Sequence, residues 1–205
     1  MRSKYLYIAD WHYNHANIIA TDNRPFRTTE EMNAALVERW NGAVSSEDTV
    51  FVLGDMFCHV EPKEAVRVLK TLNGTKVLIR GNHDYLTRDE EFCAEFKRIR
   101  EYMELEDGWQ TVVLCHYPIP CFHHHFSEDI CHLYGHVHNG FEWNMTERFK
   151  LAMEELGHYC QMYNAGAMMP WMDYTPRTLG EISSGAESHS MRMRRAERER
   201  AEKGP

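Results

Sequence analysis

The stretch KVLIRGNHD at residues 76–84 decides the fold class, because it joins a short apolar run directly to polar, turn-forming residues. Valine and isoleucine favour strands, whereas glycine, asparagine and aspartate favour turns. The stretch therefore predicts a buried strand over 76–79 that ends in a loop. Similar short apolar runs recur along the chain. They predict further strands at residues 5–9, 49–53, 111–115, 131–134 and 159–163.

Apolar residues at helical spacing separate several of these strands. One helix is predicted over residues 29–40, with a threonine available as its N-cap. A second is predicted to begin at Pro62 and to stop at Asn73-Gly74, and a third to run over 146–156. The alternation of strands and helices predicts an α/β domain.

Length and composition limit the possible classes of protein. The chain has 205 residues, 43% of them hydrophobic and 26% charged, which fits one globular domain and excludes a fibrous or disordered chain. No apolar run approaches the roughly 20 residues that span a bilayer, and no export signal opens the sequence. The six cysteines form no CxxC pair, so we expect reduced thiols and a cytoplasmic location.

The charge balance bears on the expected partners. With 23 basic and 31 acidic residues, the net charge is −8, which gives no broad attraction to nucleic acid. We therefore expect neither duplex nucleic acid nor a membrane as a partner. Residues 183–205 differ from the rest, because they are dense in arginine and glutamate. We expect a domain over 1–182 and a charged tail over 183–205, helical or disordered.

Polar side chains with metal-binding chemistry follow five of the predicted strands. Because the ends of parallel strands meet at one edge of a sheet, these side chains are predicted to lie together. Carboxylates, an amide and neutral imidazoles suit Mn, Fe, Zn, Ni or Co, and their number suits two ions better than one. The predicted ligands are Asp10, His12, Asp55, Asn82, His116, His136 and His138. The alternating pair His136 and His138 would put both imidazoles on one side only if the backbone there is extended.

In this order the motifs DxH, GD, GNHD, a lone His and GHxH make the sequence resemble the calcineurin-like metallophosphoesterase superfamily, in particular its small bacterial and phage-type members. The resemblance extends over residues 4–182. It implies a four-layer α/β/β/α sandwich of two mixed sheets and two divalent ions, with Mn²⁺ or Fe expected first and Zn²⁺ or Ni²⁺ as alternatives. It implies one ion on Asp10, His12, Asp55 and His138, and another on Asp55, Asn82, His116 and His136.

The same resemblance implies a function. The chain is expected to hydrolyse a small phosphomonoester or phosphodiester, a nucleotide among the candidates, by attack of a hydroxide that bridges the two ions. His83 is expected to face the leaving group, with Asp84 orienting its ring. His15, Arg24 and Arg27 are candidate contacts for the substrate phosphate. The alternative is a non-catalytic scaffold that keeps the fold.

A run of three histidines, His123 to His125, lies between two of the predicted strands. When protonated it could contact a substrate phosphate. The alternative is an ordinary exposed loop.

Overall fold

The computed structural model describes residues 3–203, with side chains described as far as Met191. Its strands form two four-stranded sheets, in the orders β1-β2-β3-β4 and β5-β6-β7-β8. The first sheet pairs its strands in parallel, and in the second only β5 and β6 are antiparallel. The strands are β1 (Tyr5–Ile8), β2 (Thr49–Val52), β3 (Thr75–Ile79), β4 (Arg98–Arg100), β5 (Tyr102–Asp107), β6 (Gln110–Cys115), β7 (Ile130–Tyr134) and β8 (Met162–Asn164).

Backbone contacts join the two sheets along β1. Ala9 donates to the carbonyl of Ala165 at 2.8 Å, and Ala167 donates back to the carbonyl of Ala9 at 2.8 Å. Tyr7 also forms an isolated antiparallel bridge with Arg177, which lies outside the named strands. These contacts bring the carboxyl ends of β1 and of β6–β8 to the same rim.

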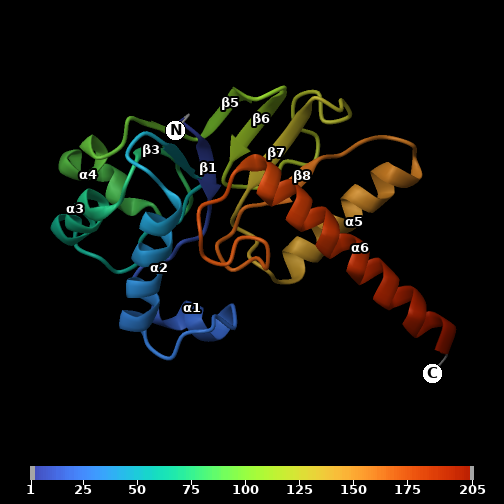
Figure 1. The fold of residues 1–205 in the computed structure, drawn as a ribbon, viewed down its shortest axis with the longest axis horizontal. Coiled ribbons are helices and arrows are strands. Elements are labelled where there is room, and N and C mark those ends of the chain that lie inside the picture. The colour runs from blue at the N-terminus through green and yellow to red at the C-terminus, as the bar shows by residue number, and fades with distance from the viewer. Residues whose placement is uncertain (1–2, 204–205) are drawn as a thin grey trace.

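Helices cover the outer side of each sheet, which gives the predicted α/β/β/α order (Figure 1). In Figure 1, α2, α3 and α4 lie beside the first sheet, and α5 and α6 lie beside the second. The helices are α1 (Ala16–Thr21), α2 (Thr29–Ala43), α3 (Pro62–Thr71), the 3₁₀ turn η1 (Tyr85–Arg88), α4 (Glu90–Ala94), α5 (Phe141–Glu155) and α6 (Leu179–Lys203).

Local sequence explains the two helices that flank β2. The side chain of Thr28 accepts from the backbone N–H of Glu31 at 3.2 Å and so caps α2, whose buried face repeats every four residues at Met32, Leu36 and Trp40. Pro62 lies in the first turn of α3, where its missing N–H has no intrahelical partner to lose. Both helices were predicted from these signals.

Several boundaries differ from the predicted ones. Helix α5 begins at Phe141 instead of 146, and β8 spans Met162–Asn164 instead of 159–163. Strand β5 was not predicted, although its residues alternate between exposed and half-buried as an edge strand does. It pairs with β6 across a tight turn at Gly108, whose φ of 69° favours glycine.

Helix α6 runs continuously through the predicted boundary between residues 182 and 183. Its first turns belong to the core, because Leu179, Ile182 and Ala186 are buried. The segment after residue 182 was expected to be helical or disordered, and it is helical as far as Lys203. The domain boundary at residue 182 stays a prediction.

All six cysteines are free thiols. None of the helices in the described part of the chain is both long enough and apolar enough to cross a bilayer.

His132 in β7 predicts a pH dependence of stability. Its ring is fully buried, with Nδ1 3.0 Å from the carbonyl oxygen of Val113 and Nε2 accepting from the N–H of Ile119 at 3.1 Å. Burial lowers the pKa of His132 to about 4, although hydrogen bonds to the carbonyls of Val113 and Tyr117 oppose this. The unfolded chain, with a histidine pKa of about 6.5, therefore binds a proton that the folded chain excludes.

We expect the free energy of unfolding to fall by about 3 kcal/mol through His132 as the pH drops from about 6.5 to about 4. Urea denaturation at a series of pH values measures this slope, and His132→Gln should flatten it. Equal slopes in the two proteins would contradict the assignment.

Candidate metal centre

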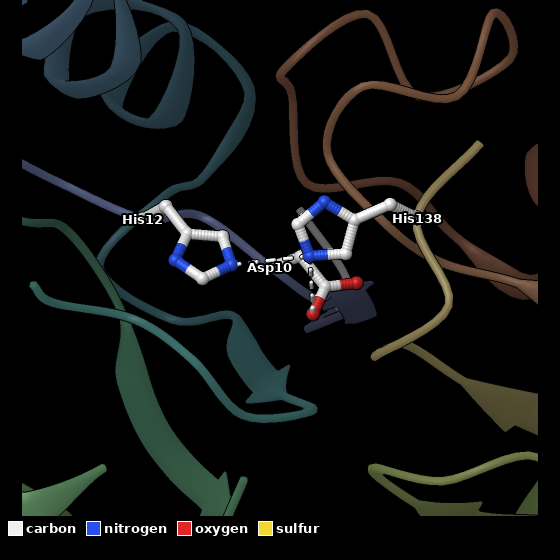
Figure 2. Close-up of side chains that lie close together, drawn as sticks. All are labelled: Asp10, His12 and His138. Atoms are coloured by element: carbon white, nitrogen blue, oxygen red, sulfur yellow. Dashed lines mark hydrogen bonds and ion pairs between the residues drawn. The ribbon is translucent and has the colours of Figure 1, made fainter. Parts of the chain in front are cut away.

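The carboxyl ends of β1, β2, β3, β6 and β7 converge at the shared rim, and all seven predicted ligands lie there. One group of donor atoms comes from Asp10, His12 and His138, whose ligand atoms lie within 4.8 Å of one another (Figure 2). The Nε2 atoms of His12 and His138 are 3.2 Å apart, and Nε2 of His138 is 3.9 Å from Oδ1 of Asp10. This geometry places two imidazoles and one carboxylate around a common point.

A second group of donor atoms surrounds the amide oxygen of Asn82. This Oδ1 lies 3.0 Å from Nε2 of His116 and 2.9 Å from Nδ1 of His136. Asp55 lies between the two groups, because its Oδ2 is 3.5 Å from Nε2 of His116 and 3.9 Å from Nε2 of His12. The structure thus brings together every side chain of both predicted ligand sets. Asp55 faces an imidazole of each set, and Asp10, which belongs to the first group, also has a ligand atom within 4.8 Å of those of Asp55 and His116.

The backbone at the rim is mostly left-handed. Positive φ is uncommon outside glycine, but Asn, Asp and His tolerate it better than other residues. Each such residue costs about 1–3 kcal/mol, and such strain persists only where the surrounding structure enforces it. Five predicted ligands adopt it, namely Asp10, His12, Asp55, His136 and His138. The backbone at His136 and His138 is therefore not extended, so the condition under which simple alternation would put both rings on one side is not met, and left-handed turns orient the rings instead.

Two glycines allow the strand ends to approach this closely. A Cβ atom added at Gly81 would lie 2.3 Å from Oδ1 of Asp55. One added at Gly135 would lie 2.6 Å from Cβ of Ala9 and 2.8 Å from Oδ2 of Asp10. Any larger residue would push the donor atoms apart. Donor chemistry and packing therefore both fit a site for two divalent cations with mixed nitrogen and oxygen ligands.

Contacts behind the imidazoles fix which nitrogen faces the centre. Nδ1 of His116 lies 2.7 Å from the carbonyl oxygen of Leu53, and Nδ1 of His138 lies 2.7 Å from Oδ1 of Asp22. Such contacts hold a ligand ring in place and leave its Nε2 free for a cation. Asp22 was not predicted from the sequence, because it lies in an irregular segment after α1 and not at a strand end.

Electrostatic effects differ between the buried groups. Burial raises the pKa of Asp10, although the charges of His138 and His116 oppose it. Burial lowers the pKa of His12 far below its ordinary range, with the neighbouring charge of His138 acting in the same direction. For His138, burial would lower the pKa, but the hydrogen bond with Asp22 and the charge of Asp10 raise it overall. The protein without cations therefore holds His12 neutral, as a metal ligand must be.

Arg24 does not have the role predicted for it. Its side chain is fully buried and donates twice to Oδ2 of Asp22, at 3.1 and 3.0 Å. It also donates to the carbonyl oxygens of Trp11 and Asp10, each at 3.0 Å. A guanidinium with these partners cannot also bind a substrate phosphate. Arg24 instead holds the first ligand loop and Asp22, which explains why a charged residue is buried here.

The other two candidate phosphate contacts lie in different places. His15 is beside the centre, with its Nδ1 3.3 Å from Nδ1 of His12. The side chain of Arg27 is 90% exposed and pairs with Glu31 at 3.2 Å. In the histidine run, His123 is exposed and contacts Glu104 at 3.1 Å. This fits the alternative of an ordinary exposed loop.

His83 and Asp84 lie at the rim but do not form the predicted pair. The His83 ring is exposed, with its centroid 5.7 Å from that of His12. The Asp84 carboxylate accepts from the backbone N–H groups of Asp55, Met56 and Gly81 at 3.0, 3.1 and 2.7 Å. Within the described side chains, no hydrogen bond joins it to the ring of His83. Asp84 is thus corrected from a residue that orients His83 to one that braces the loops after β2 and β3.

Comparisons with known proteins agree with this arrangement. A family model described as calcineurin-like phosphoesterase matches residues 3–165, which include all seven predicted ligands. An uncharacterized protein of Methanocaldococcus jannaschii is 42% identical over 139 residues, 67% of this chain and 70% of that protein. The crystal structure of a protein of unknown function from Aquifex aeolicus has a TM-score of 0.67 and 26% identity, over 89% of this chain and 99% of that one. A phosphoesterase from E. coli is more distant, with a TM-score of 0.30 and 18% identity, over 65% of this chain and 69% of that one.

The contact between Asp22 and His138 predicts an effect on metal affinity. Asp22→Asn keeps the shape of the side chain but removes the charge that orients the ring and supports its basicity. We expect the affinity for Mn²⁺, measured by calorimetric titration, to fall about 10- to 100-fold. Glu38→Gln on the exposed face of α2 is the matched control. Unchanged affinity in a folded Asp22→Asn protein would show that the contact does not support the site.

Proposed function

Because the chain belongs to the calcineurin-like phosphoesterase family, we propose that it hydrolyses a phosphomonoester or phosphodiester with the help of two divalent cations. The observation that carries this proposal is the position of Asp55. One of its oxygens faces an imidazole of each donor group, at 3.9 Å from His12 and 3.5 Å from His116. A carboxylate in that position suits two ions that share a ligand.

We keep the assignment of ligands to cations that the resemblance implied. Asp10, His12, Asp55 and His138 would hold one, and Asp55, Asn82, His116 and His136 would hold the other. Bound cations of this type acidify a water molecule and neutralise the negative charge that builds up on the phosphate. The mixed donor set favours Mn²⁺ or Fe, with Zn²⁺ or Ni²⁺ as alternatives.

Hydrogen bonds between the loops hold the donor residues in place. Asp55 is fixed from two sides, because its Oδ1 accepts from the N–H of His83 at 2.8 Å and its own N–H donates to Asp84. The backbone N–H of His136 donates to both oxygens of Asp10, each at 3.0 Å. These contacts link the loops after β1, β2, β3 and β7, so the donors are arranged before any ion binds.

His83 is the residue best placed to assist the leaving group. Its ring is exposed beside His12, and none of the donor-atom contacts described above uses its nitrogens. A protonated imidazole there can give a proton to the departing oxygen, an effect worth about 10²- to 10⁴-fold in rate. The proposal assigns this proton to His83 without help from Asp84.

Asp55→Asn tests the central carboxylate. Since Asp55 faces both donor groups, we expect this variant to bind less Mn²⁺ and to hydrolyse bis-p-nitrophenyl phosphate about a hundredfold more slowly or worse. Elemental analysis measures the bound metal, and the release of p-nitrophenol measures the rate. Glu38→Gln should behave as the unaltered protein.

Two results would count against the proposal. A fully metallated and active Asp55→Asn protein would contradict the shared carboxylate. An unaltered protein that binds metal but cleaves neither phosphomonoesters nor phosphodiesters would instead favour the non-catalytic scaffold.

His83→Ala tests the proton donor. We expect metal content to stay unchanged, while turnover of alkyl phosphates falls about 10²- to 10⁴-fold. The loss should be much smaller for p-nitrophenyl esters, because their leaving group needs no proton. Steady-state rates on both ester types check this, and an equal loss on both would argue against the role.

A further inference from the structure

A pocket of about 450 Å³ opens directly beside the metal centre. Asn82 forms part of its wall, and the same side chain reaches His116 and His136 with its amide oxygen. Tyr117 forms another part, with its ring centroid 4.7 Å from that of His136. A phosphate ester bound at the centre would therefore have room for its remaining atoms in this pocket.

Most of the charged side chains that line this pocket already form ion pairs or hydrogen bonds. Arg80 pairs with Glu101, which also lines the pocket. The Asp84 carboxylate is occupied by three backbone N–H groups. Arg88 differs, because it is exposed and its guanidinium forms no hydrogen bond or ion pair with any group among the side chains and backbone that the structure describes. It is thus the free cation of the pocket.

Arg88 follows the predicted ligand Asn82 by six residues. It ends η1, which directly follows the GNHD loop. The hydroxyl of Thr87 donates to the carbonyl oxygen of Asp84 at 2.7 Å, and the hydroxyl of Tyr85 accepts from the N–H of Val60 at 3.1 Å. These bonds connect the turn that carries Arg88 to Asp84 and to the segment after β2.

A second pocket, of about 610 Å³, lies on the other side of this turn. Tyr85 and Arg88 line both pockets, and His59 and Glu61 belong to the second alone. Arg88 therefore borders two spaces, each large enough for a small ligand group. An arginine in this position can form paired hydrogen bonds with a carboxylate or a phosphate.

We propose that the pocket beside Asn82 is a specificity subsite, in which Arg88 recognises a second anionic group of the substrate, a phosphate or a carboxylate, besides the phosphate that is cleaved. The inference rests on the proposed function, because it presumes a phosphate ester at the centre. The attraction between Arg88 and the second anionic group would be local. The net charge of −8 on the whole chain therefore does not prevent this binding.

Binding of non-hydrolysable phosphonates tests the subsite without turnover. Calorimetric titration of the protein supplied with Mn²⁺ would compare butylphosphonate, which has one anionic group, with 3-phosphonopropionate and 1,4-butanebisphosphonate, which have two. We expect at least one of the doubly anionic probes to bind about tenfold more tightly than butylphosphonate. Which of the two is preferred distinguishes a carboxylate from a phosphate as the second group.

Substitutions of the exposed Arg88 test its role. Arg88→Ala should abolish the preference and leave butylphosphonate binding within about twofold, whereas Arg88→Lys should keep part of it. Arg67→Ala, an exposed arginine on α3 outside both pockets, is the matched control and should change nothing. No preference in the unaltered protein, or the same preference in Arg88→Ala, would overturn the proposal.

Hydrolysis of bis-p-nitrophenyl phosphate, measured in parallel, distinguishes failure of the subsite from failure of the proposed function. Intact hydrolysis with no Arg88-dependent preference overturns the subsite alone. Absence of hydrolysis together with absence of phosphonate binding overturns the proposed function and the subsite with it.

Discussion

The packing of backbone around the Asp55 carboxylate is the constraint on which the rest of the rim depends. One oxygen of Asp55 is held by the N–H of His83, and the other faces His12 and His116. The N–H of Asp55 is itself held by Asp84. The loop after β2 that carries Asp55 thus meets the loops that follow three other strands, β1, β3 and β6. Because each loop must reach the same few ångströms of space, glycine is required where the loops touch, and left-handed backbone is required where the ligands turn inward.

The sequence predicted the fold class and the meeting of the ligands because both follow from a simple geometric rule. Parallel strands deliver the residues that follow them to one edge of a sheet, and the polar clusters after residues 9, 53, 79, 115 and 134 obey that rule. Edge strand β5 was not predicted, because its residues show only a weak alternation. The start of α5 was not predicted, because its N-cap is a glycine, which makes no side-chain hydrogen bond. Tertiary packing decides such boundaries.

Residues behind the ligands could not be predicted in the same way. Asp22 and Arg24 lie in an irregular segment, where no periodicity relates sequence position to direction. Arg24 was expected to face a phosphate, since a charged side chain in a loop is usually exposed. Its burial follows from a set of partners that only the folded chain assembles, two backbone carbonyls and the Asp22 carboxylate. The same holds for Asp84, whose three N–H partners come from two separate loops.

The left-handed turns at the ligands also limit how this rim can change over evolutionary time. A β-branched or bulky replacement would have to overcome the backbone geometry as well as the loss of a donor atom. Asparagine is different, because it tolerates the same geometry and resembles aspartate in size. Exchange of aspartate for asparagine at Asp10 or Asp55 is thus the least disruptive route by which a descendant could lose chemistry and keep its shape. Such an exchange would remove a charged donor from the centre and leave the left-handed turns around it in place.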